Sequence, residues 1–274
     1  MKGLTHRYED KVLFLALDTC PVYCRYCTRA YAVGGDTDTA EKISIKATKE
    51  RWNYMFEYLK ENEQIQDVVI SGGDSYRLKA SQVREIGEEL LKIDHIRRFR
   101  FATKGLAIMP MKILTDVAWT DAVCRISNKA RKQHKEVCIH THFNHSNEIT
   151  GITQEAMNIL FSRGVKVRNQ SVFQNHVNDS AESMIPLVKK LSYIKEKYGV
   201  IIIEDCAHAI GAKDGSILAG SCSFSDCTIF SFHPVKLITT GEGGMLLTDN
   251  SNYAKKFQSL RNLCFEKKRF IHNS

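Results

Sequence analysis

Long hydrophobic runs are what this sequence of 274 residues most clearly lacks. The longest one near the amino terminus, Val12–Leu17, is far shorter than the roughly 20 apolar residues that cross a bilayer. Residues 1–7 contain no apolar segment of the kind found in a secretory leader. Nine cysteines without such a leader favour a reducing compartment, where thiols stay free. We therefore expect a cytoplasmic protein with no membrane partner.

Proline is scarce as well, with 4 residues, and no Pro-, Gly- or Ser-rich stretch indicates a flexible linker. Charge of one sign rarely clusters, because the 39 basic and 31 acidic residues are interspersed. The segment His95–Arg100 is the exception, and it fits either a nucleic-acid surface or an ordinary solvated face. We expect the solvated face and no nucleic-acid partner. The net charge of +8 also suits docking of an acidic electron donor such as flavodoxin or ferredoxin.

Strand-like apolar runs alternate with segments of helical period along most of the chain. The predicted strands are Val12–Leu17, Asp67–Ser71, Arg98–Thr103, Glu136–Thr141, Val165–Val172 and Val200–Glu204. Between them, apolar residues at helical spacing predict helices, most clearly through Trp52, Met55, Phe56 and Leu59. Such alternation implies parallel strands with right-handed crossovers. Six units of this kind predict an α/β fold with a partial (βα)6 barrel and chemistry in the loops that follow the strands.

Three cysteines, Cys20, Cys24 and Cys27, form the most informative motif. They follow the first predicted strand directly, in Cys20-Pro-Val-Tyr-Cys24-Arg-Tyr-Cys27. Three thiolates at this spacing can hold three irons of a [4Fe–4S] cluster and leave the fourth iron open to a substrate. A zinc site or three unrelated core thiols are the alternatives, although a closed zinc site needs a fourth ligand nearby.

Polar motifs follow three further predicted strands. In Ser71-Gly72-Gly73-Asp74 the paired glycines allow close approach of the backbone to a ligand, and the carboxylate can accept from an amine. His140 and His142 share one face of their strand, which suits either a metal or, as we expect, polar contacts to a nucleoside. Arg168–Ser171 places four consecutive polar residues in a strand, which indicates an internal hydrogen-bond network or, as we favour, the wall of a site.

These motifs together resemble the radical S-adenosylmethionine superfamily and, more narrowly, the lysine 2,3-aminomutase family. The resemblance covers roughly residues 5–195. It is carried by the cysteine motif with Thr28 and Arg29, by Val69–Asp74, by Thr141–Thr150, and by Asn169–Val172 with Val177–Asp179. It implies a [4Fe–4S] cluster on the three cysteines and reductive cleavage of S-adenosylmethionine to a 5′-deoxyadenosyl radical. That radical would act on an amino acid, a small-molecule substrate held by pyridoxal phosphate.

The same resemblance assigns roles to individual residues. Gly72, Gly73 and Asp74 would line the methionine amine of S-adenosylmethionine. His142 and Gln170 would contact the remainder of this cosubstrate. Arg29 would pair with the substrate carboxylate, for which its fork of donors is suited.

The carboxyl-terminal part carries a second chemistry. Asp205 ends an apolar strand, where a carboxylate can pair with a pyridinium nitrogen, and Lys236 in a Gly-rich context can form a Schiff base. Ser231 can donate to a phosphate. Taken singly, a strand-end cap and an exposed lysine would explain these residues. Together with Thr239-Thr-Gly-Glu-Gly-Gly244, they resemble the DegT/DnrJ/EryC1/StrS family of sugar aminotransferases.

This second resemblance covers roughly residues 196–270. It implies pyridoxal phosphate bound covalently to Lys236, Asp205 at the ring nitrogen, His208 near the ring hydroxyl and Ser231 at the phosphate. We therefore expect two domains: a radical SAM partial barrel over 1–195, and over 196–274 a fragment of an aminotransferase-like α/β domain. Both family segments would be truncated, which makes the chain a chimera. Val200–Glu204 could serve as the sixth strand of the barrel.

Three functions are compatible with this organisation. The first is a radical SAM enzyme of aminomutase type. The second is a pyridoxal-phosphate-dependent nucleotide-sugar aminotransferase fragment. The third is a recombined gene product without activity. We favour cleavage of S-adenosylmethionine, because the cysteine, glycine and strand-end motifs needed for it are complete. A homo-oligomer is compatible with each of the three functions.

Overall fold

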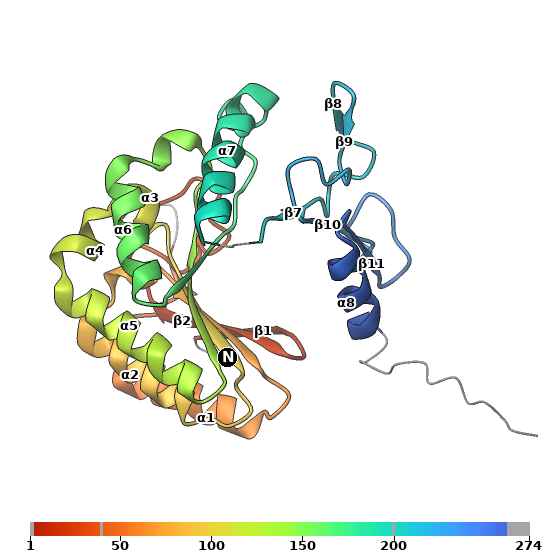
Figure 1. The fold of residues 1–274 in the computed structure, drawn as a ribbon. Helices are drawn as coiled ribbons and strands as arrows, with labels where there is room; N and C mark the ends of the chain where they lie inside the picture. Colours follow the sequence, from red (N-terminus) through yellow and green to blue (C-terminus); the bar gives the residue numbers. More distant parts are fainter. Residues whose placement is uncertain (1–2, 39–40, 199–200, 262–274) are drawn as a thin grey trace, which may run out of the picture. The chain divides into compact units, whose positions relative to one another are not determined.

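The computed structural model describes residues 3–38, 41–198 and 201–261. The chain forms two compact units, Met1–Ser183 and Met184–Ser274 (Figure 1). The predicted division at residues 195/196 falls later, within α7 (Ala181–Tyr198), and stays a prediction. Among the described residues, no helix combines the length and the hydrophobicity that crossing a membrane requires.

The first unit is built on a mixed sheet of six strands in the order β1-β2-β3-β4-β5-β6. The strands are β1 (Leu4–Tyr8), β2 (Lys11–Leu17), β3 (Asp67–Gly72), β4 (Arg98–Ala102), β5 (Glu136–Thr141) and β6 (Lys166–Asn169). β1 pairs with β2 antiparallel, and the other neighbours pair in parallel. The carboxyl ends of β2 to β6 therefore meet at one edge of the sheet, which is the edge that carries the predicted site.

Five of the six predicted strands are confirmed as β2 to β6. The prediction that Val200–Glu204 completes this sheet is wrong, because Ile203–Asp205 (β7) pairs with a strand of a separate sheet; Val200 itself lies outside the described residues. The sixth strand is instead β1, which reaches β2 through a tight turn and so needs no crossover helix. The prediction for Val165–Val172 is too long, since β6 ends at Asn169.

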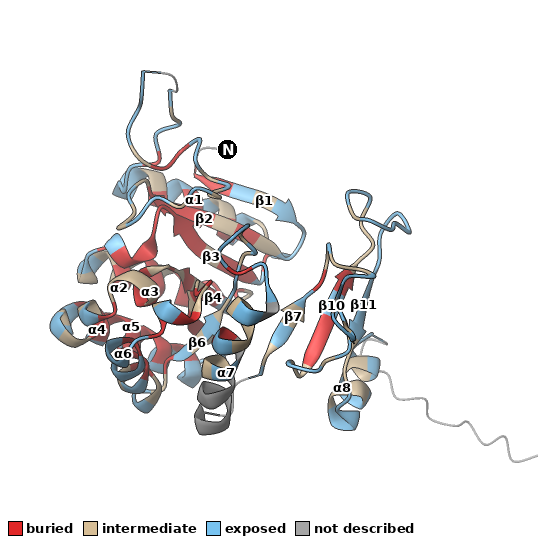
Figure 2. Cartoon of the chain, turned by 90° about the horizontal axis from the view of Figure 1, so that it is seen from above, coloured by how far each residue is buried: buried red, intermediate tan, exposed pale blue. Residues whose placement is uncertain are grey.

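Helices of the first unit cover one face of the sheet (Figure 1). They are α1 (Lys49–Glu61), α2 (Ala80–Leu91), α3 (Gly105–Ile108), α4 (Met111–Thr115), α5 (Val117–Lys132) and α6 (Gly151–Ser162), with the single turns η1 (Ser75–Arg77) and η2 (Ser146–Glu148). The rings of Phe14 and Phe56 lie 5.3 Å apart, and the indole of Trp52 donates to the Ala16 carbonyl at 2.9 Å. This packing forms a buried core between sheet and helices (Figure 2).

The other face of the same sheet carries charged side chains. Asp67, Arg98 and Glu136 stand in register on β3, β4 and β5. The Asp67 side chain is 0% exposed, lies 2.8 Å from Nε of Arg98 and also pairs with Arg100. Lys11 on β2 completes this cluster at 3.9 Å. The sheet therefore has one apolar face and one ionic face, unlike a sheet that is buried in hydrocarbon on both sides.

The second unit contains smaller sheets. Its elements are α7 from Met184 onward, β7 (Ile203–Asp205), β8 (Lys213–Asp214), β9 (Ile217–Leu218), β10 (Cys227–Ser231), β11 (Gly244–Leu247) and α8 (Ser251–Arg261). The three-stranded sheet has the order β11-β10-β7, with β7 parallel and β11 antiparallel to β10. Its small core includes the buried residues Cys206, Cys227 and Phe230. The parallel pair β7–β10 places the ends of both strands on the same side of this sheet.

Candidate active site

The cysteine loop follows β2 at the carboxyl edge of the sheet. Cys20, Cys24 and Cys27 are all free and partly exposed, and the amide of Cys27 donates to the Cys24 carbonyl at 3.1 Å. Burial raises the pKa of Cys20 to about 12, and the nearby Asp74 and the other two thiols add to this rise. Within the described ranges, no three His, Cys, Asp or Glu side chains stand in a metal-binding arrangement. The donor set of three adjacent thiols on one loop nevertheless suits an iron–sulfur cluster.

The glycine pair at the end of β3 supports this loop. Gly72 adopts a φ of +101°, and a Cβ there would lie 2.5 Å from the Leu17 carbonyl oxygen. A Cβ on Gly73 would lie 2.3 Å from the carbonyl oxygen of Thr19. The amide of Gly73 also donates to the Leu17 carbonyl at 2.5 Å. Only glycine permits such close approach, so this pair positions the backbone that leads into Cys20.

Asp74 and Arg29 are both anchored at the same edge. Asp74 is 7% exposed, and its two carboxylate oxygens accept from the amides of Tyr76 and Lys104 at 2.8 Å. Burial raises its pKa, which these hydrogen bonds and the charge of Arg29 oppose. Nε of Arg29 donates to the Gly72 carbonyl at 3.0 Å. Among the described residues, no carboxylate forms an ion pair with the terminal nitrogens of Arg29.

His142 lies just beyond the end of β5 and contacts the cysteine loop. Its Nε2 is 2.9 Å from the hydroxyl of Tyr26, which stands between Cys24 and Cys27 in the sequence. Burial and then the charge of Lys104 lower the pKa of His142, while a hydrogen bond with the Gln170 backbone opposes that shift. The structure thus brings His142 and Gln170 together, although the Gln170 side chain is exposed.

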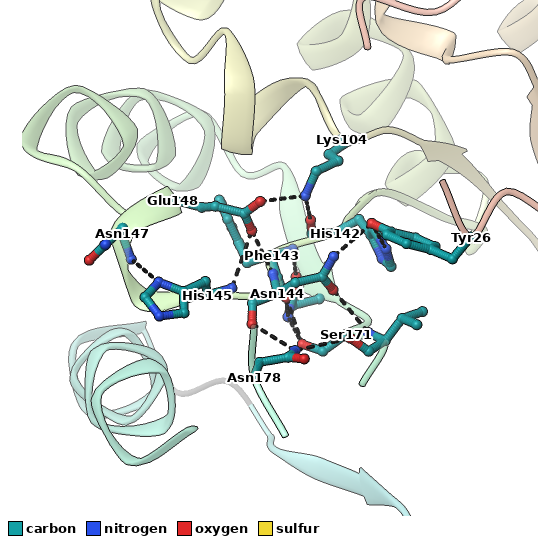
Figure 3. A network of polar contacts seen from close by, with 12 residues as sticks. Tyr26, Lys104, His142, Phe143, Asn144, His145, Asn147, Glu148, Ser171 and Asn178 are labelled. Carbon is teal, nitrogen blue, oxygen red and sulfur yellow. Dashed lines mark hydrogen bonds and ion pairs between the residues drawn. The ribbon is translucent and has the colours of Figure 1, made fainter. Parts of the chain in front are cut away.

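Asn144 is the centre of the polar network in Figure 3. Its side chain donates to the Tyr26 hydroxyl at 2.7 Å and accepts from the Val172 amide at 2.9 Å. Its backbone amide donates to Glu148 at 2.6 Å, and its carbonyl accepts from the Asn178 side chain at 2.8 Å. Asn144 is 2% exposed. Every polar group of this residue therefore has a partner, as a buried amide requires.

An ion pair supports the same network. Nζ of Lys104 lies 2.6 Å from Glu148 and donates to the His142 carbonyl at 2.9 Å. The two side chains are 13% and 23% exposed, so water screens the pair only in part. Sequence reasoning did not single out Tyr26, Lys104, Asn144 or Glu148. The sequence did contain a signal for three of these residues. Tyr26 lies inside the cysteine motif, and Asn144 and Glu148 lie within the motif Thr141–Thr150.

The arrangement of β6 explains the polar run Arg168–Ser171. In the described sheet, β6 stands at an edge, and Gln170 and Ser171 lie beyond its end. Asn169 accepts from the Phe143 amide at 2.7 Å, and Ser171 donates to the Phe143 carbonyl at 2.6 Å. These residues hold the segment after β5 in place.

The second unit brings together two of its predicted cofactor residues. Nζ of Lys236 lies 2.7 Å from Nε2 of His208. Asp205 ends β7, where its carboxylate is exposed and accepts from the Ala207 amide at 3.0 Å. Ser231 ends β10, which is parallel to β7. A basic amine, an imidazole, a carboxylate and a hydroxyl thus follow two neighbouring strand ends, a donor set that suits pyridoxal phosphate.

Comparison with known proteins divides the chain in the same way. Residues 183–274 match the DegT/DnrJ/EryC1/StrS aminotransferase family. The chain is 37% identical over 197 residues to a putative L-lysine 2,3-aminomutase of Aquifex aeolicus, covering 71% of this chain and 48% of that protein. It is 35% identical over 211 residues to the L-lysine 2,3-aminomutase of Clostridium subterminale, covering 77% and 46%. The corresponding Bacillus subtilis protein is 36% identical over 191 residues, with 70% and 36% covered.

The chain is therefore a chimera: a segment similar to lysine 2,3-aminomutases is joined to a segment that matches the DegT/DnrJ/EryC1/StrS aminotransferase family. It spans about half the length, or less, of the aminomutases that it matches. Among solved structures, the Helicobacter pylori aminotransferase PseC, involved in the biosynthesis of pseudoaminic acid, matches with a TM-score of 0.34 and 22% identity. That match covers 64% of this chain and 39% of PseC.

Proposed function

We propose that the first unit is an open part of a radical SAM-type βα barrel that cleaves S-adenosylmethionine reductively. The observation that carries this proposal is the meeting of the cysteine loop, the glycine pair and His142 at one carboxyl edge. The Tyr26 hydroxyl connects the cysteine loop to His142. Cys20, Cys24 and Cys27 would hold a [4Fe–4S] cluster, which supplies one electron to the bound sulfonium.

The surrounding residues would bind and orient the cosubstrate and an amino acid substrate. The backbone at Gly72 and Gly73 and the carboxylate of Asp74 would receive the methionine amine. His142 and Gln170, held next to each other, would contact the nucleoside. Arg29 would offer its two terminal nitrogens to a substrate carboxylate, because its Nε is already bound to Gly72.

Cleavage of S-adenosylmethionine, rather than complete migration of an amino group, is the activity that we expect to measure. The matched segment covers less than half of each relative, so the complete reaction of those proteins is not carried over to this chain. An acidic donor such as flavodoxin or ferredoxin would supply the electron, because a chain of net charge +8 attracts such a protein.

The test is anaerobic reconstitution of the full chain with iron and sulfide, followed by dithionite and S-adenosylmethionine. We expect formation of 5′-deoxyadenosine that is lost in Cys24→Ala. Cys222→Ala is the matched control, since Cys222 is also a free and partly exposed thiol but lies in the second unit. Absence of product from the reconstituted chain, or equal loss in both variants, would contradict the proposal.

A second activity is supported by the contact between Lys236 and His208. We propose that the second unit binds pyridoxal phosphate covalently at Lys236, with Asp205 at the ring nitrogen and Ser231 at the phosphate. The cofactor supplies an electron sink for amine chemistry. His208, 2.7 Å from the amine, would orient it for covalent attachment.

Covalent attachment can be measured without any turnover. The full chain is mixed with pyridoxal phosphate, reduced with borohydride and digested, and the modified lysine is located by mass spectrometry. We expect modification at Lys236 that disappears in Lys236→Ala and persists in Lys213→Ala, a change at another lysine of the same unit. Labelling spread evenly over many lysines would show non-specific reaction and reject this site.

A further inference from the structure

A basic groove lies at the other end of the six-stranded sheet from the cysteine loop. Its volume is about 600 Å³, and it opens where β4, β5 and β6 begin. The charged residues that line it are Arg97, Arg98, Arg131, Lys135, Lys166 and Glu136. Five cations thus surround the groove with one carboxylate among its lining. The basic segment His95–Arg100 of the sequence contributes two of them.

The carboxylates nearby do not balance these cations. Arg98 is paired with Asp67 at 2.8 Å, and Lys166 lies 3.6 Å from Glu136. Glu136 is also in contact with Arg168. For Arg97, Arg131 and Lys135, the described part of the chain provides no carboxylate within 4 Å. These three cations line the groove without an ion pair, although the Arg131 guanidinium also donates to the Asn128 side chain and Asp94 lies near enough to Lys135 to affect its charge.

Two of these cations are held in place before any ligand arrives. Nζ of Lys135 donates to the carbonyls of Leu91 at 3.1 Å and Ile93 at 2.6 Å. The guanidinium of Arg131 lies against Gly164, where a Cβ would stand 2.4 Å from both of its terminal nitrogens. Burial lowers the pKa of Lys135; the charge of Asp94 opposes this shift, and the charge of Arg97 adds to it. The fold thus keeps like charges close together, at a cost that a bound anion would relieve.

Helix electrostatics explain only part of this concentration of charge. Cations in the last turn of α5 stabilise the negative end of the helix dipole, which accounts for Arg131. Lys135 has a similar role at α2, because its Nζ donates to carbonyls at the carboxyl end of that helix. Arg97, in the segment that precedes β4, is not explained in this way, and its place beside Arg131 in one groove needs another cause.

We propose that this groove binds a small phosphate-bearing molecule, of the size of a diphosphate or a nucleotide. Guanidinium groups match phosphate oxygens with two parallel hydrogen bonds, and the groove offers two such groups without carboxylate partners. Its volume lies within the roughly 300–1,000 Å³ that is usual for small-molecule sites. The site is separate from the cysteine loop and does not depend on the chemistry proposed there.

Isothermal titration of the full chain with inorganic pyrophosphate at low salt tests the proposal. We expect saturable binding at one site. Arg97→Ala should weaken it by about tenfold, which corresponds to about 1.4 kcal/mol. Arg97 is exposed, so its truncation should leave the urea midpoint unchanged. Lys132→Ala is the control, because Lys132 is an exposed cation of the same region that does not line the groove.

Three results would overturn the proposal. One is the absence of saturable binding. Another is equal weakening by Arg97→Ala and Lys132→Ala, because this would show diffuse attraction to a basic surface. The third is tighter binding of a single-stranded oligonucleotide than of pyrophosphate, with a steep dependence on salt, which would indicate a nucleic-acid surface instead. Arg131→Ala provides a second variant, for which we expect the same loss as for Arg97→Ala.

Discussion

Asn144 donates a 2.7 Å hydrogen bond to the hydroxyl of Tyr26 and thereby ties the cysteine loop to the end of β5. The two residues are 118 positions apart in the sequence. The same hydroxyl meets His142 at 2.9 Å, so one phenol joins the loop to two residues of the next segment. Because Tyr26 stands between Cys24 and Cys27, this contact fixes the part of the loop that carries two thiols.

Removal of the Tyr26 hydroxyl should loosen the loop. In Tyr26→Phe, the buried amide of Asn144 loses its acceptor, which should lower the free energy of unfolding by about 1–3 kcal/mol. We also expect faster alkylation of Cys24 and Cys27 by iodoacetamide in the protein without iron, followed by mass spectrometry. Tyr23→Phe is the control, since that side chain is 59% exposed. Equal alkylation rates in the two variants would show that the hydrogen bond does not restrain the loop.

The glycine pair should tolerate no side chain. Gly73→Ala would place a Cβ 2.3 Å from the Thr19 carbonyl, a backbone atom that cannot turn aside. We expect a loss of at least about 2 kcal/mol in the free energy of unfolding, measured with urea. Gly151→Ala is the matched control, because no atom lies within 4 Å of a Cβ there and the position is helical. A similar midpoint for both variants would mean that the strand ends can move apart.

Periodicity predicts the scaffold of the first unit well. The apolar run of β2 and the helical spacing of Trp52, Met55, Phe56 and Leu59 identify a strand and a helix, because burial of apolar side chains is a local property of the sequence. β1 escaped prediction since Leu4–Tyr8 has little apolar content and owes its place to pairing with β2. The prediction for Val200–Glu204 failed for a different reason: its apolar residues indicate a strand, but they do not indicate to which sheet that strand belongs.

The site shows a similar limit. The motifs locate the cysteine loop, the glycine pair and His142, since each stands at a predicted strand end. They do not reveal that Gly72 and Gly73 pack closely against the backbone of Leu17 and Thr19. Contacts between distant segments of the chain depend on the register of the sheet, which local patterns leave open. The same holds for the pairing of His208 with Lys236 across 28 residues.

The ionic face of the sheet supports a prediction about Asp67. Its carboxylate is 0% exposed and faces Arg98, Arg100 and Lys11. Asp67→Asn removes the negative charge and leaves these cations unpaired, so we expect a loss of about 3 kcal/mol in the free energy of unfolding. Glu57→Gln breaks an exposed pair instead and should cost less than about 0.5 kcal/mol. Comparable urea midpoints for the two variants would show that water reaches Asp67.

His140 lies on this ionic face and is surrounded by charge from three other strands. Arg100 on β4 and Arg168 on β6 oppose its protonation, and Asp67 on β3 favours it. Burial is the largest effect, and together these lower the pKa of His140 from 6.5 to about 4. His142, its neighbour along the chain, adds to the lowering.

The unfolding free energy should therefore depend on pH through His140. Between its ordinary pKa of 6.5 and about 4, the unfolded chain binds a proton that the folded protein does not, so stability falls as the pH is lowered through this window. The free energy of unfolding should fall between about pH 7 and pH 5. We expect His140 to contribute roughly 1 kcal/mol of this decrease, after allowance for its partial exposure. Urea unfolding at both pH values should show a smaller loss in His140→Gln. His176→Asn, a change at an exposed histidine, should keep the loss of the unaltered chain. If His140→Gln keeps it as well, other groups govern the acid sensitivity and His140 is protonated in the fold.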